Sequence, residues 1–431
     1  MATPEVPRAP AGPIARGSVA RVGAATAATA VCGYAVLYLA ARDLDPAGFS
    51  VFGVFWGAFG LVAGAAYGLL QETTREVRSA HQTGGADSAP TVGPRIRPLP
   101  VAAAAGVVAA AILAGSSPLW SEQVFVAARW LSVGLLSVGL ACFAVHAALL
   151  GMLAGVNHWT QYGALMVTDA VIRVLVASAT FLAGWGLAGF LWATVAGAVA
   201  WLLMLIASPR ARATARLTTP VRTAVFLRGA AHSITAAGAS AILVMGFPVL
   251  LQATYGELGA EGGVVILAVT LTRAPLLVPL TAMQGNLIAY FVDQQPHRVR
   301  ALVAPAAVIV SVGAAGAVAA ALIGPWLLRV AFSPDYRASG ALLAGLTLAA
   351  IAIALLTLTG AAAVAAALHR AYAIGWVGAT VASTLLLLLP LDLGTRTVVA
   401  LACGPLIGIA VHLAALRVAG TLGPPPPPPG H

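Results

Sequence analysis

Lysine is absent from the sequence, and charge of either sign is scarce. All 23 basic residues are arginines, and charged residues make up only 8% of the 431 residues, whereas 60% are hydrophobic. A soluble domain needs about three times as much charge to cover its surface. The composition therefore excludes an ordinary soluble protein.

Cysteine is also scarce, which bears on metals and cofactors. The three cysteines lie inside apolar runs and lack the spacing of a metal site: Cys32, Cys142 and Cys403. Three histidines in or near apolar runs form no metal-spaced set either: His146, His232 and His412. We expect packing cysteines, histidines that form hydrogen bonds between helices, and neither a metal nor a cofactor.

Long apolar runs recur from one end of the chain to the other. Each could cross a hydrocarbon core of ~30 Å, and runs without period-two alternation indicate helices rather than barrel strands. The sequence predicts an all-α polytopic membrane protein with about twelve spans, the first an uncleaved helix rather than a signal peptide. The expected spans are 18–41, 47–70, 100–118, 125–153, 162–183, 186–207, 227–252, 263–291, 300–323, 339–368, 371–390 and 397–418.

The arginines are distributed unequally between the two sides of these spans. Sixteen lie on the side of the N-terminus and five on the other. Basic residues stay in the cytoplasm, so we expect both termini to be cytoplasmic and the protein to lie in the cytoplasmic membrane. The net charge of +10 is accordingly interpreted as topology signals and contacts with anionic lipid, not as nucleic-acid binding.

A basic stretch from Arg210 to Arg228 divides the spans into two sets of six. It predicts a cytoplasmic arm at 1–17, a six-helix lobe at 18–208, a linker at 209–226, a second six-helix lobe at 227–420 and a proline-rich tail at 421–431. The lobes resemble each other, because 149–155 followed by Asn157 matches 364–368 followed by His369 in layout. In the second span, five glycines on one helical face predict close helix packing: Gly53, Gly57, Gly60, Gly64 and Gly68.

Three segments carry a resemblance to a known superfamily. They are Leu44–Phe52, Gly155–Tyr162 leading into Asp169–Arg173, and Gly324–Arg329 with Ser333–Tyr336. On these segments and its layout, the chain resembles the multidrug/oligosaccharidyl-lipid/polysaccharide exporters, and within them the lipid-linked oligosaccharide flippases. The resemblance implies two six-helix bundles facing each other in a V and working by alternating access. It also implies a polyprenyl-pyrophosphate-linked saccharide as substrate and a saccharide polymerase or ligase as a possible partner.

Only three formal charges are expected deep in the membrane: Asp169, Arg173 and Arg273. An arginine at the bilayer centre costs about 2.5–3.5 kcal/mol on insertion scales, so each needs a physical reason. Asp169 and Arg173 lie one helical turn apart and can pair. A structural pair and a substrate contact both remain open for them.

Arg273 has no carboxylate within a helical turn, and Gln284 and Asn286 follow on the same expected helix. An unpaired guanidinium suits a pyrophosphate, which it can bind through two oxygens. The alternative is a structural arginine bonded to backbone carbonyls. Arg21, at the cytoplasmic mouth of the first span, could receive a headgroup or could be a snorkelling arginine.

Several other functions compete with the flippase. A drug/cation antiporter of the same superfamily would use intramembrane carboxylates, whereas the deep charges here sum to +1. A major facilitator carrier would show a Gly-x-x-x-Asp-Arg signature in the loop 71–100, which is missing. A polyprenyl-phosphate-dependent glycosyltransferase could use Asp43 and Asp45, but it needs a large outer domain. The sequence therefore favours a transporter over an enzyme.

Overall fold

Helices make up nearly all the regular structure of the computed structural model, which describes residues 16–83, 95–294 and 298–421. In that part of the chain, ten helices are long and apolar enough to cross a membrane, or eleven if one bent pair counts as a span. The expected all-α polytopic class is confirmed. The remaining expected span, 371–390, is helical too, but the helix begins with the polar residues His369 and Arg370 and is not among the ten.

In its described residues, the first half of the chain contains six candidate spans and several short helices. They are α1 (Arg16–Asp43), α2 (Pro46–Thr83), α3 (Pro98–Ser116), η1 (Ser117–Leu119), α4 (Ser121–Val124), α5 (Arg129–Gly155), α6 (Trp159–Ala183), α7 (Gly186–Ala196), η2 (Gly197–Val199), α8 (Ala200–Ala207) and α9 (Pro209–Ala215). The fourth expected span thus begins at Arg129 rather than at 125, because the chain first forms the separate turn α4.

The second half follows the same plan, with more interruptions. Its helices are α10 (Thr223–Val244), α11 (Phe247–Tyr255), α12 (Gly259–Ala282), α13 (Gln284–Asp293), α14 (Arg298–Ala301), α15 (Val303–Ala331), α16 (Gly340–Ala365), α17 (His369–Leu386) and α18 (Leu393–Thr421). Two expected spans are broken. The span 227–252 bends by 64° between α10 and α11, where Gly246 and Pro248 interrupt the helix, and 263–291 divides at Met283.

The two halves share one tight turn, which supports an internal repeat. After α5, the His158 amide donates to the Leu153 carbonyl at 2.8 Å; after α16, the Leu368 amide donates to the Ala363 carbonyl at 2.9 Å. Asn157 and Ala367 occupy the left-handed region at the same point, with φ of 60° and 59°. The repeat therefore aligns Asn157 with Ala367, not with His369 as the sequence suggested.

The seam between the halves is built on the glycine face of α2. A Cβ on Gly64 would lie 2.6 Å from the Ala241 side chain, and one on Gly68 would lie 2.3 Å from the Ile234 backbone nitrogen. Both neighbours belong to α10, so only glycine lets these helices approach so closely. The predicted close packing is confirmed, and it joins the two halves.

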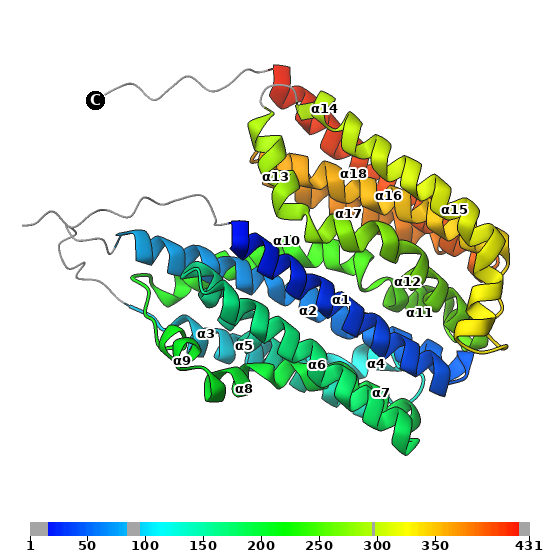
Figure 1. The fold of residues 1–431 in the computed structure, drawn as a ribbon, viewed down its shortest axis with the longest axis horizontal. Coiled ribbons are helices and arrows are strands. Elements are labelled where there is room, and N and C mark those ends of the chain that lie inside the picture. The colour runs from blue at the N-terminus through cyan, green and yellow to red at the C-terminus, as the bar shows by residue number, and fades with distance from the viewer. Residues whose placement is uncertain (1–15, 84–94, 295–297, 422–431) are drawn as a thin grey trace, which may run out of the picture.

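The halves meet most closely at one end of the molecule (Figure 1). There Arg42 Nη1 donates to the Phe332 carbonyl at 2.7 Å, and the Tyr336 hydroxyl donates to the Leu44 carbonyl at 3.2 Å. These bonds tie the α1–α2 turn to the segment between α15 and α16, and we call this the closed end. Toward the other end, where α1 begins and α18 finishes, the helix axes of the halves diverge in Figure 1; we call it the basic end, because the arginine-rich linker lies there.

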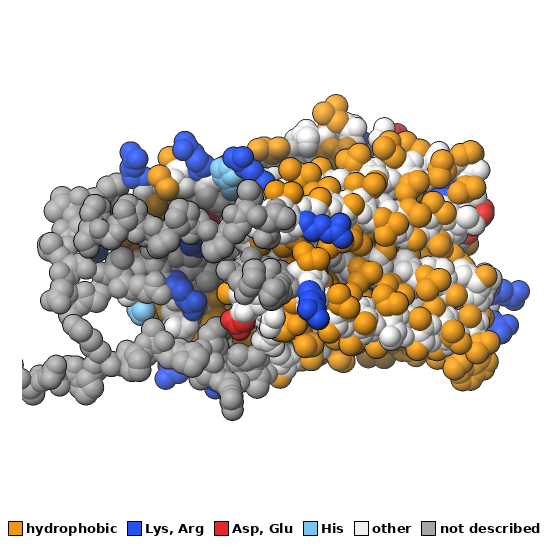
Figure 2. All heavy atoms as spheres, turned by 90° about the horizontal axis from the view of Figure 1, so that it is seen from above, with side chains coloured by type: hydrophobic (Ala, Val, Ile, Leu, Met, Phe, Trp, Pro, Cys, Tyr) orange, Lys and Arg blue, Asp and Glu red, His pale blue; other side chains and the backbone are white. Residues whose placement is uncertain are grey.

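The surface suits a lipid environment. Figure 2 shows hydrophobic side chains over much of the part of this face that is not grey. Leu119 and Leu182 are among the apolar side chains that are almost fully exposed. Such exposure would be costly in water but is favourable against lipid chains. The predicted division into 18–208 and 227–420 is compatible with this arrangement, but its boundaries stay a prediction.

Candidate functional site

The expected ion pair of the first lobe is formed on α6. Arg173 Nε donates to Asp169 Oδ2 at 3.1 Å, and Arg173 Nη2 donates to Asp169 Oδ1 at 3.0 Å. Both side chains are only 12% exposed. The third nitrogen, Nη1, donates to the Thr194 carbonyl of α7, and the guanidinium lies 5.0 Å from the centroid of the Phe59 ring. The charge of Asp169 is therefore neutralised locally by Arg173.

Aromatic side chains surround this pair. Phe143 packs edge-on against Phe59 and Tyr67, with ring centroids 6.0 and 5.7 Å apart, and it stacks on His146 at 5.0 Å. His146 is buried, and its Nδ1 has no hydrogen-bond partner within the described part of the chain. The hydrogen bond between helices that was expected of His146 is therefore not made by this nitrogen, because the ring stacks on Phe143 instead.

Tyr67 is a residue that sequence reasoning missed. Its side chain is 42% exposed although α2 lies largely inside the bundle. It could not be found from the sequence, because Tyr67 lies in an apolar span with no charged residue next to it in the chain.

Arg273 of α12 lies in the second lobe and is half-buried. Its Nη1 donates to the Val244 carbonyl, at the end of α10, at 2.5 Å. No carboxylate lies within 4 Å of its guanidinium among the residues that the structure describes. Tyr34 of α1, a residue of the other lobe, lies within electrostatic range of it. The carbonyl contact that the sequence left as an alternative is therefore present, on one nitrogen.

The other predicted site residues are not gathered around Arg273. Arg21 is exposed near the start of α1. Gln284 and Asn286 lie on α13, beyond the break at Met283, rather than on the same helix as Arg273. Asn286 is exposed, and Gln284 begins the helix. The expectation that Gln284 and Asn286 lie on the same helix as Arg273 is wrong, because α12 ends at Ala282 and α13 begins at Gln284.

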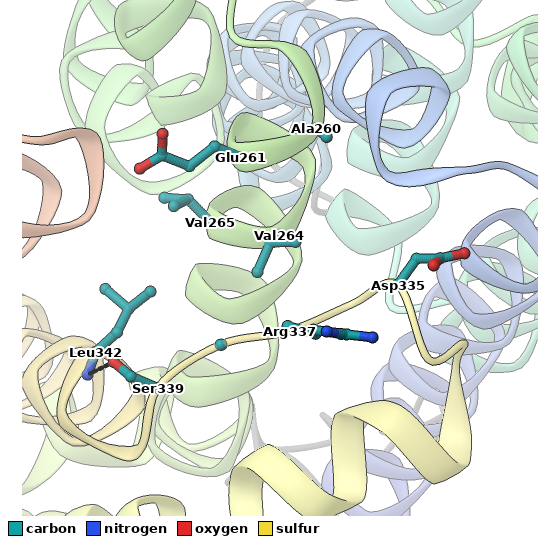
Figure 3. Close-up of a pocket in the computed structure, with 9 residues that line it drawn as sticks. Ala260, Glu261, Val264, Val265, Asp335, Arg337, Ser339 and Leu342 are labelled. Atoms are coloured by element: carbon teal, nitrogen blue, oxygen red, sulfur yellow. Dashed lines mark hydrogen bonds between the residues drawn. The ribbon is translucent and has the colours of Figure 1, made fainter.

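A separate pocket of about 350 Å³ lies at the closed end, between the first turns of α12 and the segment leading into α16. Figure 3 shows that the Glu261 carboxylate and the Arg337 guanidinium there point away from one another. Arg337 Nε instead donates to the Pro334 carbonyl at 3.1 Å. This pocket is distinct from the deep charges. Nowhere in the described residues do three metal-ligating side chains come together.

The fold matches that of solved structures of MATE family transporters. An inward-facing structure of a multidrug resistance MATE family transporter of the MOP superfamily matches with a TM-score of 0.68, at 14% identity, over 91% of this chain and 95% of that one. An outward-facing structure of the same description matches with a TM-score of 0.57, at 13% identity, over 94% and 96% of the two chains. The arrangement is thus more similar to the inward-facing structure than to the outward-facing one.

Sequence relatives place the chain in a family within this fold. The uncharacterized protein Rv3630 of Mycobacterium tuberculosis (strain ATCC 25618 / H37Rv) is 72% identical over 94% of this chain and 93% of its own. The uncharacterized protein Rv1510 of the same strain is 70% identical over 95% and 93%. The chain belongs to the family of these two mycobacterial proteins. No protein-family model matches the sequence.

Proposed function

We propose that this protein is an exporter of the cytoplasmic membrane that works by alternating access. The fold likeness to MATE transporters supports this role. The contacts of Arg42 and Tyr336 at one end, with helix axes diverging toward the other, suit an inward-facing state. The basic end then lies in the cytoplasm, as the arginine distribution favours. A transporter of this kind needs no catalytic residue.

The substrate that best fits the deep charges has an anionic headgroup, such as a polyprenyl-pyrophosphate-linked saccharide. The observation that carries this proposal is the guanidinium of Arg273. In the first lobe, Arg173 places Nη1 on a helix carbonyl and its Nε and Nη2 on a carboxylate. Arg273 places Nη1 on a helix carbonyl in the same way, but its other nitrogens face no carboxylate among the described residues. Phosphate oxygens of a bound substrate would take the place beside Arg273 that the Asp169 carboxylate takes beside Arg173.

A drug/cation antiporter is the second candidate, and the structures with the same fold favour it, since they are multidrug resistance transporters. Such a transporter would bind its cation or its coupling ion at a deep carboxylate. Asp169 is available for this only if the substrate displaces Arg173 from two hydrogen bonds and a buried position. The geometry therefore favours the anionic substrate.

The test is the flipping of a fluorescent polyprenyl-pyrophosphate-linked saccharide in proteoliposomes. Arg273→Gln should abolish flipping while the protein stays folded, because the proposed site loses its cation. Arg273→Lys should recover only part of the activity, since a point charge loses the bidentate geometry. Arg337→Gln, an exposed arginine at the closed end, is the matched control and should flip normally. Full activity of Arg273→Gln would overturn the flippase, and transport of a quaternary ammonium dye that depends on Asp169 would establish the antiporter.

A further inference from the structure

The carbonyl that holds Arg273 lacks its usual helical donor. In a regular helix, the Val244 carbonyl would accept from the amide of residue 248. That residue is Pro248, which has no N–H, and the chain bends by 64° at this point. Within the described residues, Arg273 Nη1 is the donor that this carbonyl receives. A carbonyl without a donor is costly in a membrane, so the contact has a clear physical cause.

The contact also fixes how the guanidinium is oriented. Nε and Nη2 form one edge of the planar group, and Nη1 points away from that edge. With Nη1 on the Val244 carbonyl, Arg273 keeps its whole Nε–Nη2 edge for whatever else it binds. Arg173 uses its guanidinium in this way elsewhere in the molecule. Its Nη1 donates to the Thr194 carbonyl, and its Nε–Nη2 edge donates to both oxygens of Asp169.

We propose that Pro248 is a positioning residue for the anion site. By withholding an amide from the Val244 carbonyl, it makes that carbonyl the anchor of Arg273, and the anchored guanidinium binds two phosphate oxygens through its Nε–Nη2 edge. This proposal rests on the anionic substrate proposed above. It adds that the helix break between α10 and α11 is part of the binding site rather than only a bend in the span.

The experiment measures the binding of farnesyl pyrophosphate to the full-length protein in lipid nanodiscs, with farnesol as the uncharged probe. Pro248→Ala supplies the missing amide, which competes with Arg273 for the Val244 carbonyl. We expect the Kd for farnesyl pyrophosphate to rise about tenfold, the effect of losing one orienting charged hydrogen bond. The Kd for farnesol should not change. Pro279→Ala is the matched control, because Pro279 lies in α12 and is exposed; it should bind both probes as the native protein does.

A double-mutant cycle with Arg273→Gln separates positioning from general damage. If Pro248 acts through Arg273, Pro248→Ala should add nothing to the loss already caused by Arg273→Gln. Should Pro248→Ala not be recovered as folded protein, Pro248→Ser supplies the same amide. Native affinity in the folded Pro248 variants, or additive losses, would overturn the positioning role alone. Equal binding of farnesyl pyrophosphate by native protein and Arg273→Gln would instead overturn the proposed substrate.

Discussion

Arginine side chains serve as caps for helix carbonyls in this lysine-free protein. Arg42 donates to the Phe332 carbonyl at 2.7 Å and Arg273 to the Val244 carbonyl at 2.5 Å, while Arg173 binds the Thr194 carbonyl. Each acceptor lies at a helix end or near an interruption, where the backbone ladder leaves oxygens without partners. Water cannot supply donors in the hydrocarbon region, and a guanidinium has five. One arginine can therefore satisfy a carbonyl and still bind an anion.

The pair in α6 gives the first residue-scale prediction. Arg173→Gln leaves the buried Asp169 carboxylate without its partner, a change that costs about 3–5 kcal/mol for buried pairs. Asp169→Asn should cost less, because Arg173 keeps the Thr194 carbonyl and the Phe59 ring. The double variant should lose less folded protein than the sum of the single variants. Yield and thermal unfolding in detergent measure this order.

The opposite result would give these residues a different role. If each single variant folds normally but stops transport, Asp169 and Arg173 belong to the substrate or coupling site rather than to the scaffold. Trp192→Phe on the exposed surface of α7 is a suitable control, since it should affect neither yield nor transport.

The residue scale also shows what the sequence could and could not predict about the site. The spacing of Asp169 and Arg173 was enough to predict their ion pair, because partners one turn apart meet on any helix. The acceptor of Arg273 could not be predicted, since Val244 is 29 residues away in the chain and the two residues come together only in the folded protein. Tyr67 and Tyr34 were missed for the same reason.

At the scale of elements, hydropathy predicted which segments are helical but not where those helices break. A run of twenty apolar residues has the same hydropathy whether it forms a straight helix or a bent pair such as α10 and α11, which meet at Gly246. The division of the expected span 263–291 at Met283 is likewise invisible in composition. The repeat register was wrong by two residues, because the sequence match used residue types, whereas the shared feature is a turn geometry at Asn157 and Ala367.

That shared turn supplies an element-scale prediction. Ala367 has a φ of 59°, a conformation that costs an L-residue about 1–2 kcal/mol and costs glycine almost nothing. Ala367→Gly should therefore stabilise the folded protein by about 0.5–1 kcal/mol, after the extra entropy that glycine loses on folding. An increase in the unfolding temperature in detergent would show it.

The neighbouring alanine provides the control for this turn. Ala366 has a φ of −87°, so glycine relieves no strain there, and Ala366→Gly should leave the protein unchanged or slightly less stable. An Ala367→Gly protein no more stable than Ala366→Gly would mean that the α16–α17 turn does not carry the strain inferred from its geometry.

At the scale of the whole molecule, the closed end is held by few polar contacts. Among the described residues, three hydrogen bonds connect the lobes there: from Arg42 to the Phe332 carbonyl, from Tyr336 to the Leu44 carbonyl and from Gln252 to the Gln123 carbonyl. Tyr38 also packs on Phe332, with ring centroids 5.7 Å apart. Each hydrogen bond contributes about 0.5–1.5 kcal/mol. They add to apolar packing at the same end, where Ile266 of α12 lies against Gly53 of α2. Losing hydrogen bonds there should therefore shift the population toward the open end without abolishing closure.

The last prediction concerns the hydrogen bonds that Arg42 and Tyr336 form between the lobes. In the double variant Arg42→Gln with Tyr336→Phe, the closed end should open more often, and the reporter Ile266→Cys measures the opening. Ile266 is 4% exposed and packs against Gly53 across the seam, so a thiol there reacts only when the lobes separate. With the native cysteines replaced by alanine, an impermeant maleimide added at the closed end should label position 266 about ten times faster than in the parent, because ~1.4 kcal/mol is a tenfold change in population.

Arg396→Gln is the control, since Arg396 donates to the Leu391 and Leu387 carbonyls of its own lobe and lies at the same end. Equal labelling rates in the double variant, the control and the parent would show that these two bonds do not hold the lobes together.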